Sequence, residues 1–404
     1  MELFLRKYLI VFIFLLASSL FGQNQTFFLD KNYPEVLEIS KSNQKPILLM
    51  FHAKWCPHCN KMKKEVFPNE ELIAFYTTNF NCLSIDIDTE NGKYLREKFK
   101  NNINIKYFPT FAFLDSSETL LASFSGEFNS QNFISEGKKV LIKDNQLPTL
   151  KATFLAETSN PQKCLNYITA LRRAEFDATE MTKLYLKTKK SEELFSEINW
   201  QIMANGVNKM DSDEFKFIVE NQEAFLKVIS DKRINRKIQF VVKENIKSFV
   251  ESLDTVNYNR NKKIAQNFHI KSIDSLLFKY DLIVYENTEN FEAYQKTSQQ
   301  NANRFAWNDA NTLNEISLVF LNNIQDKKAI EEAIEWSERS LKLNETIGKY
   351  YLIIKLMLKN KEFDKAMSYA TIVKKKVESF QMNTNEIENL IAQIKNKKQW
   401  IPEK

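Results

Sequence analysis

The sequence predicts two fold classes in one chain: an α/β domain with a central mixed sheet flanked by helices, followed by an all-α region. Up to about residue 145, short apolar runs typical of buried strands alternate with helical patterns. Beyond it, apolar residues recur every three or four positions and glycine nearly vanishes. With six glycines and eight prolines in 404 residues, the chain also has too few turn residues for a large all-β protein.

Residues 1–22 have the features of a signal peptide. Arg6 and Lys7 form a short basic region, residues 8–16 are almost entirely apolar, and small residues precede an expected cleavage site near Gly22. The apolar run is short for a membrane-spanning helix, so we expect cleavage and no stable membrane span afterwards, with a retained anchor as the alternative. Export would place the mature protein in the oxidising periplasm or cell envelope of a bacterium.

The α/β domain, residues 23–145, is expected to follow the order β-α-β-α-β-β-α after a first helix. Helical crossovers between the early strands imply a parallel pair, and the two later strands form an antiparallel hairpin. The expected elements, in chain order, are a helix over 34–42, a strand over 46–51, a helix from 60 that is broken at 68, a strand over 82–88, a helix over 89–100, a strand from 109 to 115, a strand over 120–124 and a helix over 133–142.

Cys56 and Cys59 lie between the first buried strand and the helix that follows it. Free backbone N–H groups and the positive end of the helix dipole favour a thiolate over a thiol at such a position. The thiolate is the attacking species in disulfide exchange. The spacing therefore predicts a redox-active disulfide, with Cys56 as the nucleophile and Cys59, one helical turn on, as the resolving thiol.

The residues between and before the cysteines are expected to tune the pair. Pro57 suits the first turn of a helix. The imidazole of His58 can stabilise the Cys56 thiolate by a hydrogen bond or, when protonated, by its charge, which would make the disulfide a better oxidant. His52 either modulates the pair or simply packs at the end of the strand. His269 lies alone in a helical pattern and is expected to be structural or solvated.

Residues 32–144 resemble the thioredoxin-like superfamily, on two separated motifs. Trp55-Cys56-Pro57-His58-Cys59 matches the active-site motif, and Phe108-Pro109-Thr110 matches the segment that holds the family's cis-proline. The resemblance covers a quarter to a third of the chain. It implies that the backbone of Phe108 pairs with the substrate chain beside Pro109 and Thr110, and that Trp55 supplies an apolar lip.

Departures from the family pattern leave the direction of the reaction open. Met50 stands six positions before the first cysteine, where thioredoxins carry a buried acidic residue, so this proton relay is missing. The Pro57-His58 dipeptide is similar to that of Dsb-type oxidases, whereas Phe108 is neither the isoleucine of thioredoxins nor the valine of those oxidases. The segment leading into the motif favours a reductase, and His58 favours an oxidase.

The other two cysteines and the charge pattern predict no further chemistry. Cys82 and Cys164 are expected to be buried core thiols, with a bridge between them as the alternative. Zinc ligands usually come as two pairs on separate turns, so we expect no metal at the motif, and no cofactor. The formal charge of +6 is spread over the chain without an arginine-rich arm, which argues against nucleic-acid binding.

The all-α region is expected to comprise a helical domain over 146–300 and helical repeats over 301–404. Ala333-Ile334-Glu335-Trp336-Ser337 and Ala366-Met367-Ser368-Tyr369-Ala370 are offset by 33 residues. Their pattern of small and aromatic residues resembles tetratricopeptide repeats, in which helix pairs pack through small residues. The usual glycine and proline of these repeats are missing, so a generic helical bundle is the alternative.

These observations predict an exported thiol–disulfide oxidoreductase that exchanges disulfides with protein substrates and with a redox partner protein. The helical region would bind a partner or client. The alternative is an envelope interaction or scaffold protein, in which the helical region binds the partner and the α/β domain is a docking module. The intact cysteine pair favours the enzyme, because a docking module does not need it.

Overall fold

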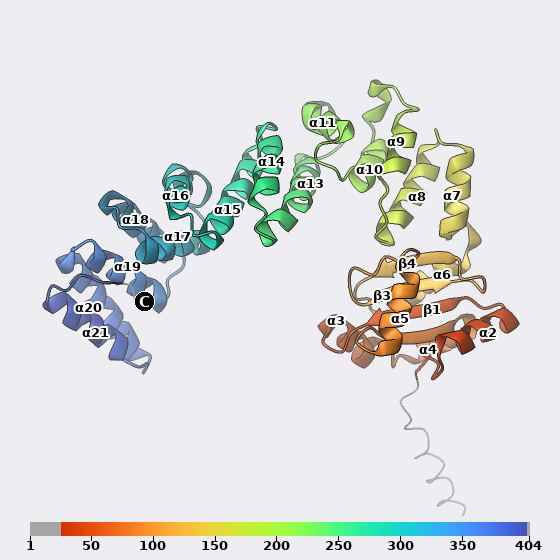
Figure 1. The fold of residues 1–404 in the computed structure, drawn as a ribbon, viewed down its shortest axis with the longest axis horizontal. Helices are drawn as coiled ribbons and strands as arrows, with labels where there is room; N and C mark the ends of the chain where they lie inside the picture. Colours follow the sequence, from red (N-terminus) through yellow and green to blue (C-terminus); the bar gives the residue numbers. More distant parts are fainter. Residues whose placement is uncertain (1–25, 402–404) are drawn as a thin grey trace, which may run out of the picture. The chain divides into compact units, whose positions relative to one another are not determined.

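The computed structural model describes residues 26–401, so the expected signal peptide lies outside the described residues (Figure 1). The chain forms two compact units. The first comprises the residues up to 208 together with 212–230, and the second comprises 209–211 and the residues from 231 onward. The domain boundaries expected at 145 and 300 remain predictions.

The first unit contains a four-stranded mixed sheet with the strand order β2-β1-β3-β4. β1 pairs with β2 in parallel and with β3 in antiparallel orientation, and β4 is antiparallel to β3. The predicted parallel pair and antiparallel hairpin are therefore confirmed. The strands are β1 (Ile47–His52), β2 (Asn81–Asp86), β3 (Thr110–Leu114) and β4 (Leu120–Ser125).

Five α-helices and a π-helical turn flank this sheet. They are α2 (Tyr33–Asn43), α3 (Pro57–Lys61), the π-turn η2 (Met62–Val66), α4 (Glu70–Asn79), α5 (Glu90–Phe99) and α6 (Ser130–Leu141). In the π-turn the N–H of Phe67 bonds to the carbonyl of Met62, five residues back, and the helix then ends before Pro68. The interruption predicted in this helix is present.

Short polar side chains fix where these helices begin. Asn32, Asn69, Thr89 and Asn129 each accept the backbone N–H three residues ahead, which satisfies one of the free donors of a first turn. The Asn129 cap explains why α6 begins at Ser130, three residues before the position that its first apolar residue suggested.

The core around the sheet is rich in aromatic side chains. β1 is buried along its whole length. Phe133 of α6 packs against Tyr76 of α4 and Phe111 of β3, with both pairs of ring centroids 4.7 Å apart. The hydroxyl of Tyr76 donates to the carbonyl of Phe133 at 2.7 Å, so α4 and α6 are joined by a hydrogen bond as well as by ring packing. This packing fixes the helices that surround the first buried strand.

Cys82 and Cys164 are free and buried. Burial raises the pKa of the Cys82 thiol well above its usual value and that of Cys164 to about 12. They belong to different hydrophobic clusters, Cys82 to that of the sheet and Cys164 to that of the helices after it. The expectation of two core thiols is confirmed, and the alternative of a Cys82–Cys164 bridge is wrong.

The rest of the first unit is helical and is attached to the sheet. Its helices are α7 (Leu147–Ala156), α8 (Pro161–Arg173), α9 (Thr179–Leu186), α10 (Glu197–Gly206), α11 (Asp213–Glu220) and α12 (Gln222–Phe225), with 3₁₀ turns η3 (Lys143–Asn145) and η4 (Ser191–Leu194). α7 and α8 contact β4. Arg173 of α8 pairs with Glu136 of α6 at 2.6 Å and stacks over Phe124 of β4.

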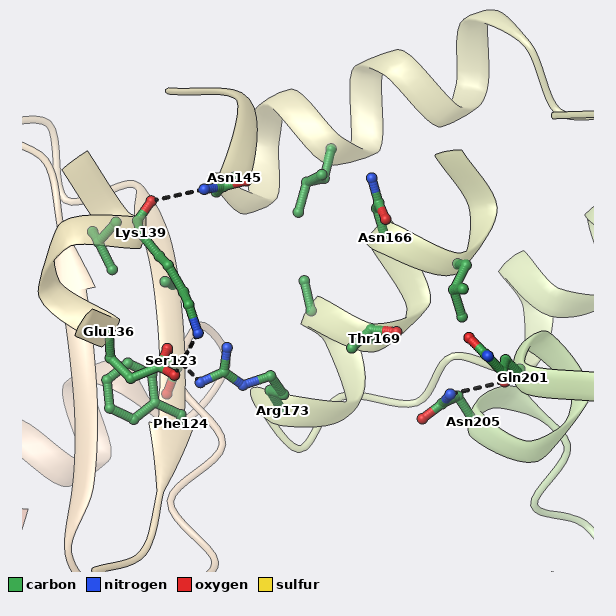
Figure 2. Close-up of a pocket in the computed structure, with 15 residues that line it drawn as sticks. Ser123, Phe124, Glu136, Lys139, Asn145, Asn166, Thr169, Arg173, Gln201 and Asn205 are labelled. Atoms are coloured by element: carbon green, nitrogen blue, oxygen red, sulfur yellow. Dashed lines mark hydrogen bonds and ion pairs between the residues drawn. The ribbon is translucent and has the colours of Figure 1, made fainter. Parts of the chain in front are cut away.

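A cavity of about 690 Å³ lies at this junction, lined by β4, α6, α7, α8 and α10. Figure 2 shows Glu136, Lys139 and Arg173 gathered on one side of it, and Gln201 and Asn205 of α10 on the other. Glu136 pairs with both cations, so the charges at this cavity are largely satisfied within the protein.

The second unit is entirely helical within the described residues, as predicted. Its helices are α13 (Asp231–Glu251), α14 (Thr255–Gln266), α15 (Lys271–Asn287), α16 (Phe291–Phe305), α17 (Ala310–Asn323), α18 (Lys327–Leu343), α19 (Ile347–Lys359), α20 (Phe363–Ser379) and α21 (Asn385–Lys395). Each of these helices from α13 to α20 packs against the next one. Over residues 26–401, no helix combines the length and apolar character needed to cross a bilayer.

The two repeated motifs lie on α18 and α20, where small residues face the core. Ala333 and Ala366 are fully buried, as is Ala370. The tetratricopeptide-like assignment remains a prediction. His269 lies in the turn between α14 and α15 with a φ of 52° and is exposed. It is therefore outside the helical pattern in which the sequence placed it.

Candidate redox site

Cys56 and Cys59 form a disulfide at the start of α3, with their Cα atoms 5.3 Å apart. Cys56 is the N-cap residue, in an extended conformation, and its Sγ accepts the backbone N–H of Cys59 at 3.2 Å. Pro57 occupies the first helical position, where its missing N–H removes no helical hydrogen bond. The first turn of α3 therefore directs a backbone donor at the sulfur that would carry negative charge after reduction.

The two cysteines are both buried but differ slightly in exposure. Cys56 keeps 3% of its surface exposed, whereas Cys59 keeps none. Trp55, which is 66% exposed, lies edge-on to the ring of Phe108 with the centroids 5.8 Å apart. The Sγ of Cys56 is 3.6 Å from the carbonyl oxygen of Phe108. Cys56 thus lies beside the ring of Phe108, which contacts Trp55, and beside a backbone carbonyl.

The second motif is adjacent to the first, but its three residues are placed differently. The Phe108–Pro109 peptide bond is cis. Thr110 is fully buried, and its hydroxyl bonds to the carbonyl of Tyr107 at 2.6 Å and to the hydroxyl of Ser125 at 2.8 Å. The structure thus brings Phe108 to Cys56 and Trp55, whereas the side chain of Thr110 faces inward. Substrate contact by these residues remains a prediction.

His58 points to a carboxylate. Its Nδ1 lies 2.9 Å from Oε2 of Glu127, and its side chain is 65% exposed. The other oxygen of Glu127 lies 2.5 Å from Nζ of Lys61, one turn further along α3. Hydrogen bonds from Lys61 and His58 lower the pKa of Glu127. Sequence reasoning missed Glu127, because it is 69 residues from His58 and no local pattern joins them.

His52 is buried at the end of β1, where its register partner on β2 is Asp86. Its ring nitrogens lie 3.1 and 3.0 Å from Nζ of Lys63. Burial, followed by the charge of Lys63, lowers the pKa of His52 to about 4, so the imidazole is neutral at pH 7. Strand alternation puts His52 on the same face as the fully buried Met50, where the acidic residue of thioredoxins is missing. A role for His52 in tuning the pair remains a prediction.

Within the described residues, no three histidine, cysteine, aspartate or glutamate side chains are grouped as a metal site would require. The groups gathered at this site are one disulfide, a neighbouring backbone donor, two aromatic rings and a histidine–glutamate–lysine cluster.

Comparisons with known proteins match the α/β domain. Residues 33–141 match the family described as a thioredoxin-like domain. The human anterior gradient protein 2 homolog is 29% identical over 122 residues, which are 30% of this chain and 65% of that protein. The disulfide bond reductase DsbH of Chlamydia pneumoniae is 29% identical over 103 residues, 24% of this chain and 62% of that protein.

The chain thus spans slightly less than two thirds of the length of these two relatives. Thioredoxin-1 of Drosophila yakuba is 35% identical over 88 residues, which are 22% of this chain and 73% of that protein. Through its N-terminal α/β domain, this chain belongs to the thioredoxin-like family.

Proposed function

We propose that this protein is an exported thiol–disulfide oxidoreductase that exchanges disulfides with protein substrates through Cys56 and Cys59. The observation that carries the proposal is the position of Cys56, which caps α3, accepts a backbone N–H and is the more exposed member of a disulfide pair. A sulfur in this setting is a good leaving group and, once reduced, a stabilised thiolate.

The geometry supports a two-step exchange. In the reducing direction, the Cys56 thiolate attacks one sulfur of a substrate disulfide, which forms a mixed disulfide and releases the other substrate sulfur as a thiolate. Cys59 then loses its proton and attacks Cys56, which closes the intramolecular disulfide and releases the second substrate thiolate. Two electrons pass from the cysteine pair to the substrate. The oxidising direction is the reverse of these steps.

The substrate chain is expected to lie against Trp55 and Phe108. The carbonyl of Phe108 is close to Cys56, so an extended substrate could pair with the main chain there while its cysteine reaches the sulfur. Trp55 provides exposed apolar surface at the same place. Both features suit protein substrates, because neither one defines an enclosed pocket for a small molecule.

The direction of electron flow depends on the reduction potential. The name of the relative DsbH supports a reductase, whereas His58 between the cysteines favours an oxidase. Equilibration of the pair with glutathione would give a reduction potential of about −270 mV for a thioredoxin-like reductase and of about −120 mV for a strong oxidase. In an oxidising compartment, a reductase would require a partner protein that reduces the cysteine pair again. An oxidase would require one that oxidises it again.

The test of the proposed function is insulin reduction by the full chain in the presence of dithiothreitol. We expect turnover by the wild type, none by Cys56→Ser, and unchanged turnover by Cys164→Ala, which alters a buried thiol in another part of the unit. An inactive but folded wild-type protein would contradict the enzymatic proposal. It would favour the alternative, a docking module next to a partner-binding helical region.

A further inference from the structure

The loop between β4 and α6 carries a carboxylate that contacts the active-site helix. Glu127 binds His58 at 2.9 Å with one oxygen and Lys61 at 2.5 Å with the other. His58 and Lys61 are three residues apart on α3, so they share one face of the helix. The Glu127 side chain is only 29% exposed, whereas those of His58 and Lys61 are 65% and 53% exposed. The carboxylate is therefore the more enclosed member of the cluster.

The loop that carries Glu127 is fixed at both ends. On one side, the N–H of Gly126 donates to the carbonyl of Pro109 at 2.9 Å, and Gly126 has a φ of 114°, which favours glycine. On the other side, Asn129 caps α6, and the hydroxyl of Ser130 donates to the carbonyl of Val66 at 3.3 Å. Glu127 is thus held beside α3 before any substrate binds.

We propose that Glu127 is a positioning residue that holds His58 away from Cys56 in the oxidised protein and so sets the reduction potential of the cysteine pair. His58 immediately follows Pro57 on the turn that carries Cys56, where its imidazole can serve either the thiolate or the carboxylate. In the oxidised protein there is no thiolate, and the carboxylate binds the imidazole. After reduction the two anions compete for it.

The competition between the carboxylate and the thiolate predicts in which direction Glu127 shifts the reduction potential. A carboxylate near the site disfavours a thiolate there, both by like-charge repulsion and by keeping His58 occupied. Glu127 therefore stabilises the oxidised form relative to the reduced form. Removal of its charge should make the protein more oxidising. Lys61 partly neutralises the same carboxylate, so removal of Lys61 should act in the opposite direction.

The redox step that reports this effect is equilibration with glutathione. Two glutathione thiols give up two electrons and two protons and become glutathione disulfide. The Cys56–Cys59 bond accepts both electrons. Cys59 takes up one proton, and the other goes to solvent when Cys56 remains a thiolate. The equilibrium constant for oxidation of the protein by glutathione disulfide then falls as the reduced form becomes more stable.

This inference rests on the proposed function, and its test is separate from the insulin assay. In the full chain, Glu127→Gln should lower the oxidation constant about fivefold, which corresponds to ~20 mV for a two-electron couple. Lys61→Met should raise it about twofold. Glu127→Asp keeps the charge and should stay closer to the wild type than Glu127→Gln. Glu70→Gln, the same charge change at the exposed start of α4, should leave the constant unchanged.

A double-mutant cycle separates positioning of His58 from a general charge effect. In a His58→Gln background, the additional change Glu127→Gln should alter the constant less than twofold. The proposal is overturned if Glu127→Gln changes the constant less than twofold in the wild-type background, or if it has the same effect in both backgrounds. A fall in the constant of Lys61→Met would also overturn it. A wild type that fails to exchange with glutathione or insulin would instead contradict the proposed function.

Discussion

The redox site and the second unit use charged side chains in opposite ways. At the redox site, Glu127 and His58 are partly exposed, pair with each other and lie 69 residues apart in the chain. In the second unit, Lys349 and Lys359 are 6% exposed and bind main-chain carbonyls. Lys349 donates to Ser340 and Asn344 near the end of α18, and Lys359 donates to Phe320 and Leu321 near the end of α17.

Charged side chains have different functions in the two regions. Next to a reacting sulfur, a pair of opposite charges can exchange partners as the sulfur changes state. At helix ends, a buried ammonium group donates to carbonyls of the last turn, and two of these, Phe320 and Ser340, also accept a backbone N–H. Substitution of Glu127 or His58 should therefore alter the reactivity of the cysteine pair, whereas substitution of Lys349 or Lys359 should alter only local stability.

The largest expected effect tests whether the chemistry is confined to the first region. Cys59→Ser removes the resolving thiol, so the mixed disulfide on Cys56 should persist and insulin turnover should fall at least about a thousandfold. Non-reducing electrophoresis should show trapped substrate adducts. The double variant Cys56→Ser/Cys59→Ser is the control and should trap none. Adducts in the double variant would mean that Cys82 or Cys164 takes part.

Glycine substitutions compare close packing in the two regions. A Cβ at Gly92 in α5 would lie 1.9 Å from the carbonyl oxygen of Asp86, so Gly92→Ala should destabilise the sheet by about 3 kcal/mol. At Gly348 in α19 a Cβ would meet nothing within 4 Å, and Gly348→Ala should be neutral or stabilising by up to about 1 kcal/mol. Hydrogen exchange of peptides from β2 would measure the stability change in Gly92→Ala, and that of peptides from α19 the change in Gly348→Ala. A Gly92→Ala protein with unchanged β2 exchange would contradict the packing argument.

His52 should make the first region sensitive to acid. Its pKa is lowered to about 4, so the unfolded chain binds a proton at a higher pH than the folded one. The stability that neutral His52 contributes is complete above about pH 6.5 and is lost as the pH falls towards 4. We expect a loss of about 2 kcal/mol at pH 5 relative to pH 7, and a smaller loss in His52→Gln.

Hydrogen exchange of β1 peptides in urea at both pH values would measure this difference. If the wild type and His52→Gln lost the same amount, another group would be responsible for the acid sensitivity.

The smallest expected effect concerns the buried lysines. Lys359→Met removes the ammonium donor from the carbonyls of Leu321 and Phe320, of which Phe320 keeps the N–H of Ile324, and should destabilise the second unit by about 1–2 kcal/mol. Lys355→Met, which removes a pair with Glu386 near the surface, should cost about 0.5 kcal/mol or less. The urea dependence of hydrogen exchange in peptides from α17 would distinguish the effects of the two variants. Equal effects would mean that the position of the ammonium group at the helix end is unimportant.

The sequence was informative where a feature depends on neighbours in the chain. The cysteine pair, the strand before it and the break at Pro68 all lie in short segments with clear patterns, whereas the cis peptide before Pro109 was expected from the family resemblance. The helical character of the C-terminal region also follows from local apolar spacing. The start of α6 was missed although its signal is local, because Asn129 is a cap that precedes the first apolar residue.

The environment of the site could not be predicted, because it depends on the folded arrangement of distant segments. Glu127 reaches His58 only because β4 returns beside β3 and its loop contacts Pro109. Lys63, in the π-turn after the motif helix, contacts His52 at the end of β1, eleven residues earlier in the chain. Thr110 has the expected position in its motif, but its hydroxyl is used inside the fold.

The two free cysteines have a consequence in the oxidising compartment proposed for this protein. A thiol that is enclosed and resists ionisation cannot join disulfide shuffling with passing proteins. While the chain is folded, Cys82 and Cys164 therefore take no part in disulfide exchange, and the proposed exchange begins at Cys56. Cys82 and Cys164 could react only in the unfolded chain. Wrong disulfides that involve them would therefore form while the chain folds and not during the proposed exchange with substrates.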